Sequence, residues 1–321
     1  MILGLIEHDR GTLNSHTLEM LTLARGLAEL LDCPLAAIIV GENGRSLAPD
    51  LAAHGVSKVY LVQHERLDDY APEAWAESIV QLIGTAQPQV VTAVGTERGN
   101  EVMAHVAARM NLPLAANCLE VHPGDSYEMT RVCWGGSLLE EVRLSGELKL
   151  FTVAPFVIPV TETAVSGEIP VETVTPSLSE KDFRGRIVDR VEAASDKVSL
   201  TDARVVVGGG RGVGSKDGFA SLEALAELMG GAVGASRAVT NLGWRTHADQ
   251  IGQTGTRIAP HLYIACGVSG AIQHMVGCKG AKHILAINTD PEAPIIAKAD
   301  YAIIGDLHEV VPALIAGINE L

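Results

Sequence analysis

The chain has 321 residues, a formal net charge of -15, a hydrophobic content of 47% and a mean hydropathy of +0.22. The apolar content excludes a disordered chain, and the length favours about two domains. The acidic balance argues against a broad surface for nucleic acid or anionic lipid, and no apolar run approaches the ~20 residues that cross a bilayer.

The first residues and the cysteines indicate the compartment. MILGLIEHD lacks a basic n-region, so it is read as a strand and not as a signal peptide. The five cysteines form no CxxC pair, and the eleven histidines form no HxH or HxxxH pair. Neither disulfides nor a metal centre is therefore expected. We expect a cytoplasmic bacterial protein; a mature chain of the mitochondrial matrix would share these features.

The first third of the chain alternates strand-like and helix-like patterns. Short apolar runs suited to buried parallel strands cover residues 1–6, 34–41, 58–63 and 90–96. Helical patterns lie between and after them at 17–31, 71–84 and 100–110. This alternation predicts an α/β domain with a parallel sheet and right-handed crossovers.

The pattern changes near residue 114. Strand-like pieces separated by Gly and Pro turns run to about residue 159, and LKLFTVAPFVIP (148–159) is the last of them. We interpret all of them as an antiparallel extension of the first domain. A mixed stretch rich in charge, Pro and Ser follows, which predicts a boundary near 185–200 and two domains, 1–190 and 200–321.

A second βα series fills the rest of the chain. Strands are predicted at 203–207, 261–267, 283–288 and 301–306, with a helix at 217–230 and another at the C-terminus. Small polar residues follow several of these strands. Because ligands bind at the carboxyl ends of parallel strands, we expect these residues to converge on one site.

The stretch VVVGGGRGVGSKDG (205–218) has the shape of a nucleotide-binding loop. A dinucleotide fingerprint starting at Gly210 and Gly212 would need a third glycine where Ser215 stands. A Walker A loop would need Gly, and not Ser215, before Lys216. From this loop alone, a phosphate site with Arg211 as a donor and a plain strand–helix turn remain equally open.

The other loops have ordinary interpretations when each is taken alone. Ser236 and Arg237 could be a helix cap and a surface charge, QIGQTGT (250–256) a connection, and His274 a structural histidine. Together they supply donors and amides at successive strand ends, but no nucleophile–base pair and no metal cluster. This favours holding a large phosphorylated cofactor over catalysing hydrolysis.

The ordered motifs GGRG, VGASR, GQTG, SGAIQH, IN-x-DPEAP and ADY-x-I-x-x-D closely resemble the alpha subunit of electron-transfer flavoproteins, as does EHDRGTLNSHTLEML near the start. The resemblance is most specific between residues 208 and 306. It implies a C-terminal doubly wound, Rossmann-like domain that binds FAD, with no catalytic residues. The implied cofactor-binding residues are Arg211, Ser236, Arg237, Gln250, Gln253, Thr254, Gly255, Ser269, Gly270, Gln273, His274, Asn288 and Asp306.

Within that resemblance each group has an implied role. Arg211 lies toward the nucleotide, Arg237 lies against the flavin ring, and Thr254 approaches its reactive nitrogen edge. A guanidinium, or an imidazolium of His274, at the pyrimidine side would favour the anionic forms of the flavin. The chain departs from the family where lysine is frequent, at Thr256 and Thr289, which leaves the FAD affinity open.

The resemblance implies an electron carrier that forms a heterodimer with a beta subunit, which holds AMP or a second FAD. Flavin dehydrogenases of the acyl-CoA type would be donors and a quinone reductase an acceptor. The alternative within the family is a subunit of an electron-bifurcating complex that oxidises NADH. Outside the family, a nicotinamide-dependent dehydrogenase and an adenine-nucleotide sensor are the rival hypotheses.

Overall fold

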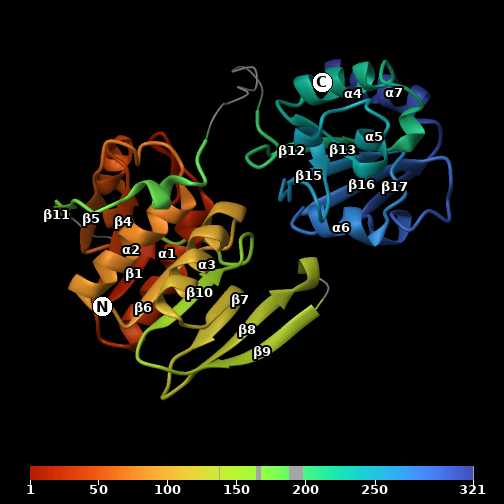
Figure 1. The fold of residues 1–321 in the computed structure, drawn as a ribbon. Helices are drawn as coiled ribbons and strands as arrows, with labels where there is room; N and C mark the ends of the chain where they lie inside the picture. The colour runs from red at the N-terminus through yellow and green to blue at the C-terminus, as the bar shows by residue number, and fades with distance from the viewer. Residues whose placement is uncertain (137, 164–167, 188–197, 321) are drawn as a thin grey trace. The chain divides into compact units, whose positions relative to one another are not determined.

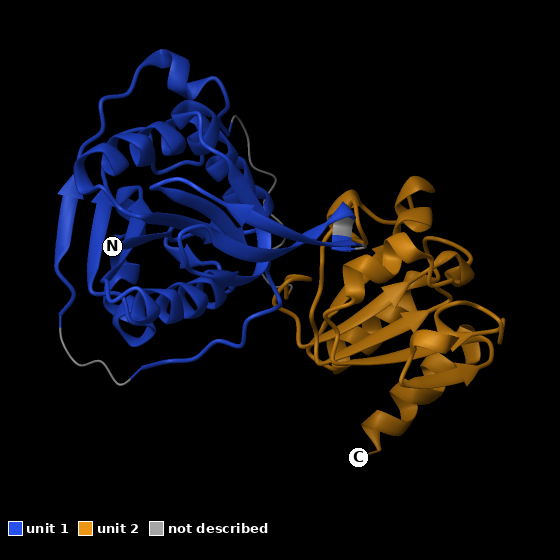
Figure 2. Ribbon diagram, turned by 90° about the horizontal axis from the view of Figure 1, so that it is seen from below, with its two compact units in different colours: residues 1–190 blue, residues 191–321 orange. Residues whose placement is uncertain are grey.

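A computed structural model describes residues 1–136, 138–163, 168–187 and 198–320. The chain divides into two compact units, Met1–Arg190 and Val191–Leu321, which are coloured separately in Figure 2. Each unit is built around a sheet of its own, in agreement with the predicted α/β class (Figure 1).

The described residues of unit 1 contain eleven strands, of which nine form the main sheet. The strands are β1 (Ile2–Leu5), β2 (His8–Asp9), β3 (Thr12–Leu13), β4 (Leu35–Val40), β5 (Lys58–Val62), β6 (Val90–Val94), β7 (Leu114–His122), β8 (Tyr127–Cys133), β9 (Leu138–Leu144), β10 (Lys149–Val153) and β11 (Val171–Val174). The helices are α1 (His16–Leu30), α2 (Pro72–Ala86) and α3 (Glu97–Met110), with 3-10 segments η1 (Glu42–His54), η2 (Trp134–Gly136) and η3 (Glu180–Phe183).

The order of the main sheet corrects one sequence-based expectation. The strands lie in the order β11-β5-β4-β1-β6-β10-β7-β8-β9, and only β7, β8 and β9 pair in antiparallel fashion. β10, which we expected in the antiparallel extension, pairs in parallel with both β6 and β7. Its residues KLFTV are all buried, as suits an interior strand of a parallel sheet covered on both faces.

Apolar residues of the parallel strands pack on both faces of this sheet. One face packs against α1 and η1, and the inner side of the antiparallel extension continues the same cluster. The other face packs against α2 and α3. The extension itself projects as a twisted three-stranded ribbon in Figure 1.

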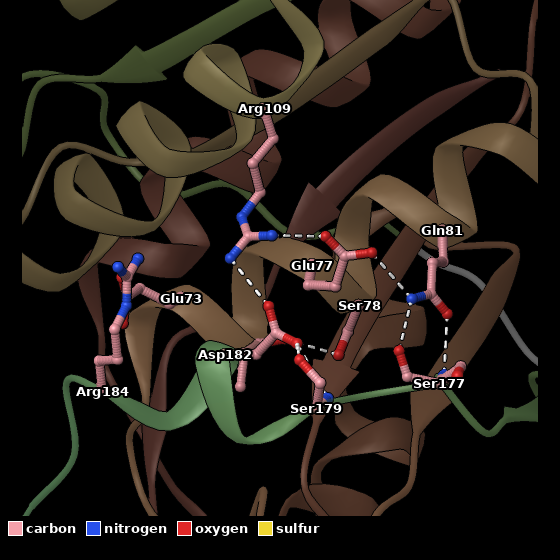
Figure 3. Close-up of polar contacts among 10 residues, drawn as sticks. Glu73, Glu77, Ser78, Gln81, Arg109, Ser177, Ser179, Asp182 and Arg184 are labelled. Atoms are coloured by element: carbon pink, nitrogen blue, oxygen red, sulfur yellow. Dashed lines mark hydrogen bonds and ion pairs between the residues drawn. The ribbon is translucent and has the colours of Figure 1, made fainter.

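A strap formed by residues 175–185 follows the edge strand β11 and crosses α2 and α3. Arg109 of α3 contacts Glu77 of α2 at 2.7 Å and Asp182 of the strap at 3.0 Å (Figure 3). The backbone amide of Ser177 donates to Gln81 Oε1, and Arg184 pairs with Glu73. The sequence did not predict β11, because its charged, partly exposed pattern VETV resembles a loop.

Unit 2 contains six strands that form one parallel sheet. They are β12 (Val205–Gly209), β13 (Ala232–Ser236), β14 (Gln250–Ile251), β15 (Leu262–Cys266), β16 (His283–Asn288) and β17 (Tyr301–Ile304). Its helices are α4 (Phe219–Leu228), α5 (Arg237–Asn241), α6 (Ile272–Cys278) and α7 (Leu307–Asn319), with 3-10 segments η4 (Arg211–Val213), η5 (His247–Asp249) and η6 (Ile296–Lys298).

The order of this second sheet is β14-β13-β12-β15-β16-β17. With β12 counted as the first strand, this reads 3-2-1-4-5-6, the order of dinucleotide-binding Rossmann folds. α4 and α7 cover one face of the sheet, while α6 belongs to the apolar cluster on the other. The predicted doubly wound, Rossmann-like C-terminal domain is therefore confirmed.

Candidate functional site

The candidate site lies at the carboxyl edge of the unit 2 sheet. All six strands are parallel, so the loops that follow them emerge at the same edge. The strand order reverses between β12, which leads through α4 to β13, and β15, which returns to the other side of β12. Such a reversal opens the crevice in which ligands of open α/β sheets bind.

The first two glycines of GGGRG serve the packing of the strand itself. A Cβ at Gly208 would lie 2.3 Å from the hydroxyl oxygen of Tyr263, and one at Gly209 would lie 2.4 Å from the ring of Phe219. The two rings occupy opposite faces of the sheet, because successive strand residues point to opposite sides. These glycines make room for aromatic rings.

The next two glycines allow the loop to pack against the loop after β15. A Cβ at Gly210 or Gly212 would come within 2.1 Å or 2.7 Å of the backbone of Gly267. The amides of Gly210 and Gly212 already donate to the carbonyls of Cys266 and Gly267, at 2.8 and 3.1 Å. These two amides are therefore used within the protein and are not available to a ligand. The exposed guanidinium of Arg211, in the same loop, has no partner among the described residues.

A second arginine stands at the end of β13. Ser236 is half-buried and occupies the N-cap position of α5, without a side-chain hydrogen bond to that helix. Arg237 is exposed, and its guanidinium forms no ion pair or hydrogen bond with any residue that the structure describes. The edge thus presents two unpaired guanidinium groups, which suit an anionic or polarisable ligand.

Gln250 is buried and organises the loop that follows it. It is 2% exposed, and its amide Nε2 donates to the hydroxyl of Thr254 at 3.0 Å. Its Oε1 accepts from Thr240 of α5 at 2.7 Å, and the Thr240 hydroxyl also lies 3.1 Å from the carbonyl of Arg237. We predicted Gln250 as a cofactor contact. In the structure its side chain orients Thr254 and joins the loop to α5.

The GQTG loop packs directly on α6. The amide of Gln253 donates to the carbonyl of Gln273 at 2.7 Å, while both side chains are exposed. Gly252 and Gly277 meet so closely that a Cβ at Gly277 would lie 2.4 Å from the Gly252 Cα atom. Gly255 is required by its own loop, since a Cβ there would lie 2.3 Å from the carbonyl oxygen of Gln250.

His274 is the one buried titratable side chain among the predicted site residues. It is 7% exposed, its Nε2 lies 2.7 Å from the hydroxyl of Tyr263, and its Nδ1 has no hydrogen-bond partner in the described chain. Burial lowers the pKa of this imidazole to about 4, against the smaller opposite effect of the Ile251 carbonyl. The ring is therefore neutral near pH 7 in the chain by itself.

The remaining predicted residues lie along the same edge. Ser269 is exposed. Gly270 has a φ of +79°, which favours glycine, and a Cβ there would lie 2.5 Å from the backbone nitrogen of Ile295. The amide group of Asn288 is engaged by the protein, donating to the Val268 carbonyl and accepting from a backbone amide. Asp306 caps α7 by accepting from the amide of His308.

Sequence reasoning missed two residues of this site. Tyr263 lies inside β15 and reads as a core aromatic, and Thr240 lies in a short helix without periodicity. Only their hydrogen bonds reveal them, and these depend on the tertiary fold.

Within the described residues, no group of three His, Cys, Asp or Glu side chains could hold a metal ion. No helix there is long and apolar enough to span a bilayer.

Comparison with known proteins assigns both parts of the chain. Residues 2–179 match the electron transfer flavoprotein domain, and residues 199–279 match the electron transfer flavoprotein FAD-binding domain. The chain is 38% identical to an electron transfer flavoprotein subunit alpha of Clostridium acetobutylicum, over 98% of this chain and 95% of that protein. It is 36% identical to the subunit alpha of Thermoanaerobacterium thermosaccharolyticum, over 98% and 96%.

A relative named Protein FixB, from Clostridium saccharobutylicum, is 37% identical over 98% of this chain and 95% of its own length. Among solved structures, Acinetobacter baumannii MurG covers 92% of this chain and 79% of its own, with 11% identity and a TM-score of 0.31, too low to support an argument. The two domain matches and the full-length relatives agree with the motifs at the carboxyl edge. The chain belongs to the electron transfer flavoprotein family, as an alpha subunit that carries the flavin-binding domain.

Proposed function

We propose that this chain holds one FAD at the carboxyl edge of unit 2 and acts as an electron carrier, paired with a beta subunit. The observation that supports this most is the set of unsatisfied donors at that edge. Arg211 and Arg237 have no partner in the described chain, and the buried Nδ1 of His274 has none either. All three lie in the unit whose residues 199–279 match the FAD-binding domain.

The residues present fit such a cofactor. The crevice between β12 and β15 is the place where dinucleotide-sized ligands lie in this strand order. An orphaned buried nitrogen such as His274 Nδ1 costs free energy unless a ligand or water satisfies it. Ser236, Gln253, Ser269, Gln273, Asn288 and Asp306 would complete the wall around it.

When bound, the flavin supplies the redox chemistry, and the chain supplies a fixed electrostatic environment. Arg237 provides a permanent positive charge, because a guanidinium does not lose its proton in proteins. His274 is neutral and can only offer a dipole. We therefore assign the tuning of the redox potential mainly to Arg237.

Thr254 contributes a directed hydroxyl. Its oxygen accepts from Gln250 Nε2, so its own proton is available for an acceptor on the ligand. Gln250 is in turn held by Thr240, which fixes the direction of the donor. The backbone amide of Thr256 donates to the Gln250 carbonyl at 2.7 Å, a contact that does not depend on whether residue 256 is Thr or the Lys frequent in the family.

We propose that residues 1–190 contact the beta subunit and that residues 200–321 carry the flavin. The tip of the β8–β9 hairpin supports this: the side chains of Trp134, Leu138 and Leu139 are 79%, 54% and 67% exposed. Large exposed apolar residues grouped in this way are typical of protein–protein interfaces. Donors would be flavin dehydrogenases of the acyl-CoA type, and a quinone reductase would be an acceptor.

The cofactor content of the complex co-expressed with its beta subunit tests this proposal. We expect a yellow complex with one FAD in this chain, and the partner's content, AMP or a second FAD, separates a simple carrier from a bifurcating one. A colourless complex would instead support the nucleotide sensor, and a colourless complex that binds NADH stoichiometrically would support the nicotinamide-dependent dehydrogenase. Reduction of the bound flavin by an acyl-CoA dehydrogenase and its substrate tests the donor.

A further inference from the structure

We propose that Tyr263 is a positioning residue that holds the His274 imidazole with its proton on Nδ1, so that the ring presents a neutral N–H donor to the flavin. This inference deepens the proposed function and depends on it only for the identity of the acceptor. Tyr263 is not among the residues that the sequence motifs indicate, because it lies within β15 and not in a loop.

The two side chains form an isolated buried pair. Tyr263 is fully buried, and its hydroxyl oxygen lies 2.7 Å from His274 Nε2. The ring centroids are 5.9 Å apart with an interplanar angle of 35°, so the contact runs through the hydroxyl and not through stacking. The missing side chain of Gly208 leaves the space that the phenol occupies. The sheet therefore holds the phenol at the position where it meets the imidazole of α6.

The hydrogen-bond inventory of this pair decides between the two neutral tautomers. The Tyr263 hydroxyl has one proton to donate, and His274 Nε2 is its acceptor within the described chain. If Nε2 accepts, the proton resides on Nδ1, and every polar group except the Nδ1–H is satisfied. If Nε2 instead donates, the phenol proton and the Nδ1 lone pair are both left buried without partners. The second arrangement leaves one more buried group without a partner, so the first arrangement is favoured.

The favoured tautomer has a consequence for the ligand. Nδ1–H then has no partner of full hydrogen-bond geometry, with the Ile251 carbonyl as the protein acceptor nearest to the ring, and it is available to an acceptor such as a carbonyl oxygen of the flavin ring. Burial keeps the ring neutral, because it lowers the pKa of His274 to about 4. The Ile251 carbonyl, which can only accept, also favours a proton on the ring. Tyr263 thus sets the direction of a donor dipole without touching the cofactor.

Nitrogen-15 NMR of histidine-labelled complex tests the tautomer in the unaltered protein, with the His274 signals identified by their loss in His274→Gln. We expect a protonated Nδ1 and an unprotonated Nε2, both before and after removal of the flavin. A proton on Nε2 in the flavin-free complex would overturn the inference. This measurement needs no variant of Tyr263, and it stands even if the complex holds a ligand other than FAD.

Tyr263→Phe removes the hydroxyl and keeps the ring that fills the space beside Gly208. We expect a mixture of both His274 tautomers, a shifted flavin midpoint potential, and FAD affinity reduced by no more than about tenfold, since one hydrogen bond is lost. Tyr127→Phe is the matched control, because Tyr127 is a buried tyrosine that packs in the apolar cluster of unit 1. An unchanged tautomer and potential in Tyr263→Phe would overturn the inference, whereas absence of flavin from the unaltered complex would overturn the proposed function.

Discussion

The two units place polar residues at equivalent edges of their sheets and use them in opposite ways. In unit 1 the strand order reverses between β1 and β6, and Glu7 lies just beyond β1. Its carboxylate accepts from the amide of Asn14 at 2.8 Å and from the hydroxyl of Thr96. In unit 2 the corresponding reversal is lined by Arg211, whose guanidinium has no partner among the described residues.

The unit 1 edge is satisfied by further side chains as well. Asn100 donates to Asn117 at 3.1 Å and accepts from Thr152 at 2.7 Å, while Thr152 also accepts from the Asn117 amide. A carboxylate already occupies the place near the start of α3 where an anionic ligand would bind. A shared α/β topology therefore does not fix function. What distinguishes the two edges is whether their donors are paired within the protein.

Removing the Glu7 carboxylate should give the largest effect, because the donors at this edge of the unit 1 sheet then lose their acceptor. In Glu7→Ala the side chains of Asn14 and Thr96 lose a buried acceptor, and we expect unit 1 to be destabilised by about 3 kcal/mol. Hydrogen–deuterium exchange should rise at the starts of α1 and α3 and stay constant in unit 2. Glu128→Ala, at an exposed position of β8, is the control. Equal protection in both variants would show that this edge is not held by Glu7.

The buried imidazole of unit 2 should make stability depend on pH. The pKa of His274 is about 4 in the folded chain against an ordinary value of 6.5, so the unfolded chain binds more protons between these values. The stability is therefore complete above about pH 6.5 and falls as the pH drops toward 4, by about 3 kcal/mol. His274→Gln should flatten this slope in chemical denaturation curves. His283→Gln, at an exposed histidine, should leave it intact.

The role of Arg237 at the carboxyl edge of unit 2 can be tested through the midpoint potential of the bound flavin. Loss of its charge should lower the midpoint potential of bound flavin, because a nearby cation stabilises the more negative reduced state. An effect on the order of 2 kcal/mol corresponds to roughly 90 mV for a one-electron step. Arg204→Ala removes an exposed arginine at the opposite end of the central strand and should change little. A potential in Arg237→Ala equal to that of Arg204→Ala, with FAD still bound, would refute the assignment.

Arg211 should give the smallest effect. An exposed guanidinium beside a phosphate contributes about 1 kcal/mol, so Arg211→Ala should weaken FAD binding roughly fivefold with no change of potential. The loss should shrink as salt is added, because exposed charges are screened. Fluorescence titration of the flavin-free complex at two ionic strengths measures both quantities. A salt-independent loss would indicate a packing role for this side chain.

The alternation of strands and helices was readable from the sequence, because apolar periodicity reflects which faces are buried. The place of β10 was not, since KLFTV shows only that the strand is buried and not which neighbours it pairs with. Its insertion pairs Lys149 with Val90 of β6, 59 positions away, and Leu150 with Leu114 of β7, 36 positions away, and pattern reasoning does not see such pairings. β11 escaped for the opposite reason, because an exposed edge strand needs no apolar pattern.

The candidate site was predictable in its position but not in its internal connections. Loops after parallel strands must share an edge, so Arg237 and the GQTG loop could be expected together. Gln250 donates a hydrogen bond to Thr254, and Asn288 donates one to the backbone. Both contacts depend on side-chain directions, which the spacing of residues in the sequence does not encode. The same is true of the glycines in GGGRG. They pack against Tyr263, Phe219 and Gly267, which lie elsewhere in the sequence, so the motif alone does not reveal why glycine is needed.

The close packing of Gly208 and Tyr263 couples two positions that lie far apart in the sequence. A side chain at 208 can be accommodated only if the ring at 263 is truncated, and that truncation also removes the hydroxyl that fixes His274. We therefore expect a substitution at Gly208 to displace the Tyr263 hydroxyl and so to alter the flavin site, because an added Cβ would lie 2.3 Å from that oxygen. Gly208 and Tyr263 form one steric unit across two neighbouring strands.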